Sequence, residues 1–322
     1  SILSHGFVVD GKGLKMSKSM GNVISPEEIL KNYGADILRV WVASSDYAED
    51  LRIDKSILIQ HAESYRKIRN TFRFMLGNLK DNFEKQDFKK ININEFEELE
   101  KYILNKLFLI DKAVKTNLKN YSFHRLYKEL LNFCTLDLSS FYFDIRKDVL
   151  YCDSPTSKKR INCVIVLNII LESLLKWFAP ILVFTTEEIY NLVNKNNEES
   201  IHENYFVDIP QNWQNLKLNE KWLKLLKIKQ EVNIAIEEKR SNKEIGSSLE
   251  TEIKLIVDSE NFELLKEIDL AEYFITSKAE ITKSENVKNV EIEVKKINGI
   301  KCPRCWKIIE NKCLRCEDAI HN

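Results

Sequence analysis

Apolar residues recur every three or four positions through most of the chain up to Asn194, the spacing that places them on one face of an α-helix. The longest such pattern covers residues 54–79. Similar patterns predict helices over 94–118, 122–144 and 158–177, the last continuing past Pro180 to Val193. Because the links between these segments are short, neighbouring helices are expected to be antiparallel. The pattern therefore predicts a mainly α fold built on an antiparallel helical bundle.

Local signals predict the structure before residue 54. Ser25 and Pro26 followed by two glutamates are typical of a helix start, with a capping hydroxyl, a proline in the first turn and acids at the positive end of the helix dipole. This helix should end at Gly34 and be followed by a second over 35–43. Residues 7–10 favour a strand and run into Asp10-Gly11, a strong hairpin signal, so a hairpin is expected to present residues 11–22.

The pattern changes after Asn194, where a polar run and an irregular stretch predict a domain boundary. Residues 217–239 have helical spacing and 259–268 are also expected to be helical. Residues 250–257 and 290–297 alternate between apolar and polar as strands do. The last third of the chain is therefore predicted to contain a small α/β unit.

Charge is balanced over the chain, with 49 basic and 49 acidic residues, so no overall field attracts nucleic acid. Basic residues nevertheless cluster: residues 65–90 hold eight basic and three acidic side chains, 217–243 hold eight and four, and 295–316 hold seven and one. Each cluster on its own is as consistent with a solvated helix face. Three of them on a neutral chain favour a polyanionic partner.

The most apolar stretch, residues 161–184, is interrupted by Glu172, Lys176 and Pro180, so it predicts a buried helix and not a membrane span. The first residues lack the basic start and apolar run of an export signal. Seven cysteines, an odd number, argue against a disulfide framework. Together these features predict a cytoplasmic protein that does not bind a membrane.

Four cysteines near the end form two CxxC pairs, CPRC and CLRC, separated by seven residues: Cys302, Cys305, Cys313 and Cys316. This arrangement predicts one structural zinc ion per chain, because four thiolates fill a tetrahedral site and leave no open position for catalysis. Metal binding would then supply folding free energy to a segment with almost no core. Neighbouring basic residues would favour the thiolates and form a cationic surface (Lys301, Arg304, Lys307, Lys312 and Arg315). His321 in place of one cysteine is the weaker alternative.

The stretch GKGLKMSKSMGN, residues 11–22, combines glycines, lysines and serines. Gly6 with Gly11-Lys12 has the spacing of a phosphate-binding P-loop, but Gly13 stands where a magnesium-binding Ser or Thr is required, so we reject that reading. Lysines on a glycine-hinged loop can neutralise charge on a leaving pyrophosphate. The pattern leaves a pyrophosphate loop and a polar turn both open.

A resemblance decides between them. KMSKSMGNVISPEEILKNYGADILRVWVASSDY resembles the second signature region of class I aminoacyl-tRNA synthetases, and with YRKIRNTFRFMLGNL it is most similar to the isoleucyl-tRNA synthetase family. Farther along, LLNFCTLDLSSFYFDIRKDVLYC and FAPILVFTTEEIY resemble the family's anticodon-binding helices. WLKLLKIKQEVNIAIEEKRSNKEIGSSLE and CPRCWKIIENKCLRC resemble its C-terminal region and zinc knuckle. A valyl-type enzyme is disfavoured by the terminal cysteine motif.

The resemblance implies an isoleucine–tRNA ligase, which uses ATP with Mg²⁺ to activate isoleucine and transfers it to isoleucine tRNA. Lys18 would bind ATP and stabilise the transition state, with Lys15 and Ser17 as further contacts. It also implies five parts: the end of the catalytic domain (1–25), a stem-contact region (26–90), an anticodon-binding bundle (91–212), an α/β junction domain (213–297) and a zinc knuckle (298–322). A monomer is expected.

Two departures from the family pattern stand out: the gap between the CxxC pairs is short, and Leu14 occupies a position where a basic residue is common. Nothing that resembles the family's first signature, its nucleotide-binding sheet or its editing domain precedes the KMSKS stretch. The chain is therefore expected to be a C-terminal portion that is inactive alone. The alternative is a stand-alone, non-catalytic tRNA-binding protein derived from a synthetase.

Overall fold

The computed structural model of the chain describes residues 2–79, 83–194 and 199–321. These fold into two compact units, each assembled from separate segments of sequence. Unit 1 comprises Ser1–Phe96, Ile103–Phe141 and Val164–Gln214, and unit 2 comprises Glu97–Tyr102, Tyr142–Cys163 and Asn215–Asn322. Two long helices, α4 (Glu98–Lys119) and α7 (Lys158–Phe178), begin in unit 2 and continue into unit 1.

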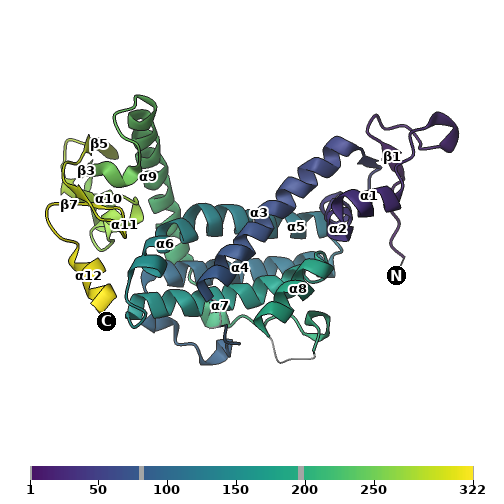
Figure 1. Cartoon of the computed structure of the whole chain (residues 1–322), viewed down its shortest axis with the longest axis horizontal. Coiled ribbons are helices and arrows are strands. Elements are labelled where there is room, and N and C mark those ends of the chain that lie inside the picture. The colour runs from purple at the N-terminus through teal and green to yellow at the C-terminus, as the bar shows by residue number, and fades with distance from the viewer. Residues whose placement is uncertain (1, 80–82, 195–198, 322) are drawn as a thin grey trace. The chain divides into compact units, whose positions relative to one another are not determined.

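Unit 1 is helical (Figure 1), as the apolar spacing predicts. Besides the longer parts of α4 and α7, its helices are α1 (Pro26–Tyr33), α2 (Ala35–Ser44), α3 (Lys55–Leu79), α5 (Phe123–Asn132) and α8 (Val183–Val193). A π-helical stretch, Phe133–Tyr142, follows α5 without a break. The predicted fold class, mainly α with a helical bundle, small sheets and a terminal cysteine cluster, is confirmed.

The break at Pro180 is stabilised by polar side chains of α2. Arg39 donates Nε to the Ile181 carbonyl at 3.0 Å and Nη2 to the Pro180 carbonyl at 2.7 Å. The buried Asp36 carboxylate accepts from the backbone N–H and hydroxyl of Thr185 at 2.8 and 2.6 Å, and so caps the start of α8. Carbonyls and amides that the break leaves without helical partners are satisfied in this way.

Helix α7 is the one helix among the described residues that is long and apolar enough to cross a membrane, and 78% of its most apolar window is buried inside the protein. It behaves as the buried helix that its interrupting polar residues predict. Near the N-terminus, Ser25 caps α1 by accepting from the Glu28 N–H at 3.3 Å, and Gly34 ends that helix with a positive φ of 84°. Both local predictions are confirmed.

The predicted N-terminal hairpin is wrong. Strand β1 (Val8–Asp10) pairs in parallel with β2 (Leu51–Ile53), and the expected antiparallel partner is reduced to one isolated bridge between Val9 and Lys15. The Asp10 side chain accepts the N–H groups of Lys12 and Leu14, which tightens the turn into a loop. Because Leu51 and Ile53 are buried, pairing with this distant strand stabilises β1 more than a local hairpin would.

Unit 2 contains α6 (Phe143–Cys152), α9 (Leu216–Ser241) and a three-stranded sheet of order β4-β3-β5. Strand β3 (Thr251–Val257) is parallel to β4 (Lys278–Lys283) and antiparallel to β5 (Val290–Lys296), with α10 (Ser259–Leu265) and α11 (Leu270–Tyr273) between β3 and β4. Strand β4 was not predicted because only two residues of KAEITK, Ala279 and Ile281, form its half-buried apolar face, and the other four are exposed. The end of the chain adds the short pair β6 (Ile300–Lys301) and β7 (Ile308–Ile309), then α12 (Leu314–His321).

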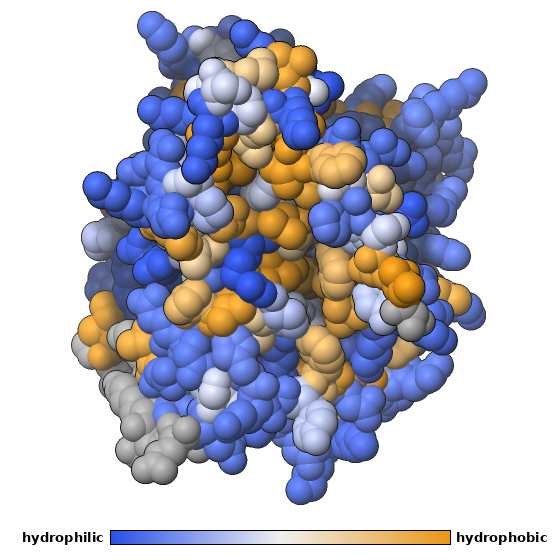
Figure 2. All heavy atoms as spheres, turned by 90° about the vertical axis from the view of Figure 1, so that its right-hand side faces the viewer, coloured by the Kyte–Doolittle hydropathy of each residue, from blue (hydrophilic) through white to orange (hydrophobic). Residues whose placement is uncertain are grey.

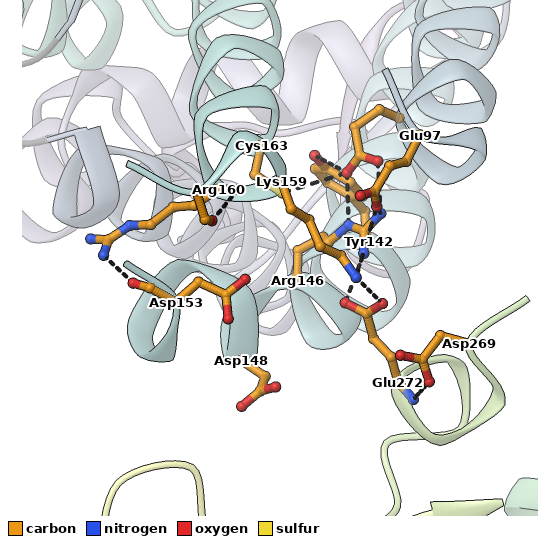
Figure 3. Close-up of polar contacts among 12 residues, drawn as sticks. Glu97, Tyr142, Arg146, Asp148, Asp153, Lys159, Arg160, Cys163, Asp269 and Glu272 are labelled. Atoms are coloured by element: carbon orange, nitrogen blue, oxygen red, sulfur yellow. Dashed lines mark hydrogen bonds and ion pairs between the residues drawn. The ribbon is translucent and has the colours of Figure 1, made fainter. Parts of the chain in front are cut away.

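A buried charge cluster joins the helical and α/β parts of unit 2 (Figure 3). Arg146 of α6 donates Nε and Nη2 to the two oxygens of Glu100, each at 2.7 Å, and Nη1 to Glu272 of α11 at 2.7 Å. Lys159 of α7 pairs with Glu272 at 2.6 Å, and Glu97 accepts from Arg146 at 2.9 Å. The first turns of α4 and α7 are thereby connected to α6 and α11.

Candidate functional site

The KMSKS stretch, residues 15–19, lies on a loop that side-chain amide and carboxylate groups close. Asn22 accepts the Ser17 N–H at 2.9 Å and donates to the Asp10 carboxylate at 2.9 Å and to the Lys15 carbonyl at 3.3 Å. The Asn22 hydrogen bond and the Leu14 N–H lower the pKa of Asp10. The sequence signalled Asp10 only as the start of a hairpin turn and gave no role to Asn22, although Asp and Asn beside glycines are typical of side chains that close a loop.

The loop exposes its lysines and buries part of its methionine. Lys15 and Lys18 are exposed, and among the described residues neither forms an ion pair. Met16 packs against the cluster of Ile29, Trp41 and neighbouring apolar residues. Ser17 caps the single 3₁₀ turn Lys18–Met20 by accepting the Met20 N–H at 3.3 Å. The structure thus brings the three predicted residues onto one loop, fixed by its backbone and by Met16, with both ammonium groups facing solvent.

Two glycines allow this loop to form. Gly21 has a φ of 65°, the left-handed region that glycine adopts without strain, where it ends the 3₁₀ turn. At Gly11, a Cβ atom would lie 2.2 Å from Asp54 Oδ2, so any larger residue would displace that side chain. Asp54 caps α3 by accepting the Ile57 N–H at 2.8 Å, which ties the loop geometry to the first long helix.

The four predicted ligand cysteines come together in unit 2. Their sulfur atoms all lie within 4.8 Å of one another, and the Sγ atoms of Cys305 and Cys313 are 3.7 Å apart. A zinc–sulfur bond of about 2.3 Å places tetrahedral sulfurs about 3.8 Å apart, so the cluster is compatible with a zinc site. The seven-residue gap therefore still allows the two pairs to meet. The side chain of His321, the alternative ligand, lies outside the described part of the structure.

The first CxxC pair forms a tight turn. The N–H of Cys302 donates to the Lys307 carbonyl at 2.9 Å and the N–H of Trp306 donates to the Cys302 carbonyl at 3.0 Å, with Trp306 at a φ of 64°. Burial acts to raise the pKa of Cys302, but the N–H groups of Cys305 and Arg304 outweigh it and bring the pKa to about 7. Amides directed at a sulfur favour the thiolate, the form that binds metal.

Two of the five basic residues around the cysteines form specific contacts with a helix. Arg304 and Arg315 contact α6, through the carbonyls of Tyr151 and Cys152 and the carboxylate of Asp148 respectively. Lys301 lies 5.7 Å from the centre of the exposed Trp306 ring, and Lys312 lies 3.5 Å from Glu317. Against the opposing effect of burial, Arg315 and the half-buried Lys307 lower the pKa of Asp148. Sequence spacing gave no signal for Asp148 as the partner of an arginine so distant in sequence.

The basic cluster on α3 faces solvent. Arg66 pairs with Glu63 one turn away, while Arg69 contacts the Tyr65 hydroxyl at 3.0 Å and Glu188 at 3.8 Å. These contacts are those of a solvated helix face. The exposed arginines are also accessible to an anionic partner.

Apolar side chains reach the surface at the N-terminal end of unit 1. Viewed from the side of β1 and α1, the surface has several orange, apolar areas among hydrophilic ones (Figure 2). Between residues 2 and 20, the large exposed apolar residues are Ile2, Leu3, Phe7, Val8, Leu14 and Met20. Phe7 is 81% exposed although it directly precedes a strand. Contiguous exposed apolar surface rimmed by polar residues is typical of a contact surface.

Comparison with known families agrees with this arrangement. The family model described as the anticodon-binding domain of tRNA ligase matches residues 100–255. The model described as tRNA synthetases class I (I, L, M and V) matches residues 1–54, which include the KMSKS loop and β1.

Curated relatives carry the name isoleucine–tRNA ligase. The protein of Pelagibacter ubique is 59% identical over 318 residues, which is 99% of this chain and 35% of that protein. The protein of Natranaerobius thermophilus is 40% identical over 99% of this chain and 36% of its own length. The chain thus spans about a third of the length of the relatives it matches.

A solved structure shares the fold at low sequence identity. It is a ternary complex of a leucyl enzyme from Agrobacterium radiobacter K84 with tRNA and LeuAMS, aligned over 92% of this chain and 27% of that one with a TM-score of 0.51 and 14% identity. The closely similar relatives, the two family models in their order along the chain and this shared fold agree. The chain belongs to the class I aminoacyl-tRNA synthetase family, where it matches the isoleucyl-tRNA synthetases.

Proposed function

We propose that this chain supplies the KMSKS loop and the tRNA-binding part of an isoleucine–tRNA ligase. The ligase would use ATP to activate isoleucine as the adenylate and would transfer the aminoacyl group to isoleucine tRNA. We propose that it acts in the cytoplasm as a monomer. The observation that carries the proposal is the 59% identity to an isoleucine–tRNA ligase over 99% of the chain. The division at residues 25, 90, 212 and 297 is proposed with it.

In this proposal Lys18 acts on the phosphates of ATP. Its exposed ammonium stands on a loop fixed by Asn22 and Met16, so little conformational freedom is lost when a polyphosphate binds. Formation of the adenylate releases pyrophosphate, and a lysine placed beside the leaving group neutralises the charge that develops there. Lys15 and Ser17 are proposed as further contacts, with Mg²⁺ carried by ATP.

The four cysteines are proposed to hold one structural zinc ion. The cluster uses all four sulfurs, so the ion would stabilise the terminal fold and leave no position for substrate. Cys302, Cys305 and Cys316 are buried, which suits a closed site.

The apolar residues near β1 support a contact with the rest of a catalytic domain. Residues 1–54 match the class I synthetase family model, and their exposed apolar side chains include Phe7 and Ile2. We propose that these side chains are covered in the complete enzyme. The chain alone should then bind tRNA but form no adenylate.

Two measurements test the proposed function. The purified chain is titrated with isoleucine tRNA and with a valine tRNA control, and affinity for the former should fall steeply as salt increases, because phosphate contacts release counterions. The complete enzyme is then compared with its Lys18→Ala variant in isoleucine-dependent exchange of pyrophosphate into ATP, with Lys12→Ala as the matched loop control. We expect a loss of about 100-fold or more for Lys18 only.

Each measurement has a contradicting result. Equal exchange rates for Lys18→Ala and Lys12→Ala would remove Lys18 from the reaction. Failure to bind isoleucine tRNA would exclude the tRNA-binding part of the proposal. Binding together with an inactive complete enzyme would favour the stand-alone, non-catalytic tRNA-binding protein.

A further inference from the structure

We propose that Arg304 and Arg315 are positioning residues that dock the cysteine segment onto the C-terminal turn of α6, so that metal binding is coupled to the order of that turn. The cysteine segment, from β6 to the end of α12 (residues 300–321), is the structured part of the predicted zinc knuckle. The inference rests on the proposed zinc site. Beyond that site, the inference couples zinc binding by the cysteines to the order of α6, a helix outside the knuckle.

Arg304 caps the end of α6. Its Nη1 donates to the Cys152 carbonyl at 2.5 Å and its Nη2 to the Tyr151 carbonyl at 3.3 Å. These are the last two residues of the helix, whose carbonyls lack partners within it, and they lie at the negative end of the helix dipole. A guanidinium satisfies both at once because its N–H groups are arranged as a fork.

Arg315 makes the second contact, one turn earlier on α6. Its Nη1 and Nη2 donate to the two oxygens of Asp148 at 2.6 and 2.8 Å, the two-pronged geometry that makes an Arg–carboxylate pair strong. Figure 3 shows Asp148 on α6 apart from the cluster around Arg146. Burial acts to raise the pKa of Asp148, but the Arg315 guanidinium outweighs it and lowers that pKa.

Both arginines occupy the same place in their motifs. Arg304 directly precedes Cys305 and Arg315 directly precedes Cys316, so each guanidinium is covalently next to a proposed ligand. The knuckle has little regular structure of its own, with two strands of two residues each before α12. Closing the four cysteines around a metal therefore fixes both arginine backbones at once, and without metal the two contacts must each order a flexible segment.

The docking also forms a cavity of about 300 Å³ in unit 2, whose walls include residues of α6, of the region of α11 and of the knuckle. Tyr151 comes from α6, Ile275 follows α11, and Trp306 comes from the knuckle. Because the knuckle supplies one wall, the same coupling controls whether this cavity is complete.

Coupling of this kind is reciprocal. If metal binding stabilises the docked knuckle by some factor, then docking strengthens metal binding by the same factor. Two charge-assisted contacts of this geometry correspond to about tenfold or more in a local opening equilibrium. Loss of the arginine contacts should therefore weaken zinc binding even though all four cysteines remain.

The test uses the full chain with zinc alone as the probe. Hydrogen exchange is measured at the amides of Tyr151, Cys152 and Asp153, with one equivalent of zinc and after removal of zinc by a chelator. The proteins compared are the wild type, the Arg304→Gln/Arg315→Gln variant and Arg240→Gln. Arg240 lies on α9, where it forms one exposed contact of 2.8 Å with Glu237 one turn away, and it serves as the control arginine. Zinc affinity is measured by competition with a chromophoric chelator.

We expect removal of zinc to speed exchange at these amides by about tenfold or more in the wild type and in the control. In the double variant, exchange should already be fast with zinc bound, and its zinc affinity should be lower by a similar factor. Wild-type exchange that is the same with and without zinc would overturn the proposal, as would a double variant with wild-type exchange and zinc affinity. A wild type that binds no zinc would instead refute the zinc site of the proposed function.

Discussion

Replacement of Arg146 by methionine should be among the most destabilising single changes in unit 2. The Arg146 guanidinium is 3% exposed and makes four contacts of 2.7–2.9 Å with three carboxylates. Methionine fills a similar length without a charge. The change removes the guanidinium and leaves its partners in place.

The loss of stability expected for Arg146→Met depends on the hydrogen-bond donors that remain around Glu100. Its side chain is 1% exposed, and its other donors are the Tyr142 hydroxyl at 3.2 Å and the Cys163 thiol at 3.5 Å. Removal of one member of a buried ion pair leaves an uncompensated charge and costs about 3–5 kcal/mol. Lys159 still pairs with Glu272 at 2.6 Å, so the loss should fall mainly on Glu100.

The assay is native-state hydrogen exchange of the β3 amides, which gives an opening free energy for unit 2 without assuming that the whole chain unfolds in one step. Arg146→Met/Glu100→Gln should be about 1–2 kcal/mol more stable than Arg146→Met alone, because the second change removes the unpaired charge. Arg240→Met, which breaks an exposed pair, should change stability by less than about 0.5 kcal/mol. An Arg146→Met loss below about 1 kcal/mol, or strict additivity with Glu100→Gln, would refute the reasoning.

Three further changes test separate features. Burial lowers the pKa of Lys229 to about 8, so between pH 8 and 10.5 this lysine is protonated in the unfolded chain and largely neutral in the folded one. Because buried cysteines such as Cys134 and Cys163 have raised pKa values and act in the opposite sense over this range, the measured quantity is the unfolding free energy of the wild type minus that of Lys229→Met. This difference should rise by about 3 kcal/mol from pH 8 to 10.5, and a constant difference would contradict the prediction. Asp36→Ala removes the buried cap of α8 and should cost about 2 kcal/mol in urea unfolding, with a loss below about 0.5 kcal/mol counting against that role. Cys316→Ser should reduce zinc from about one ion per chain towards none in metal analysis, while Cys134→Ser, a change at a buried cysteine outside the cluster, should retain it.

Local patterns determined the helices. The spacing of apolar residues predicted α3 and α9, and proline and glycine predicted where α1 ends and α7 stops. These features depend on side chains within a few positions of one another, which sequence displays directly. The cluster of two CxxC pairs could be predicted in the same way, because its four cysteines lie within fifteen residues of sequence.

Tertiary structure decided the pairings over long distances. Strand β1 joins Leu51–Ile53 and not its neighbour in sequence, and β4 is a strand because β3 offers it a hydrogen-bonding edge. Likewise Arg146 finds Glu100 and Glu272, and Arg315 finds Asp148, across separations that no spacing rule spans. Sequence alone determined which segments are helical, where the lysine loop lies and which cysteines can share a metal. Only the folded chain determined which charges are buried together, because burial in a low-dielectric interior depends on the packing of all the elements at once.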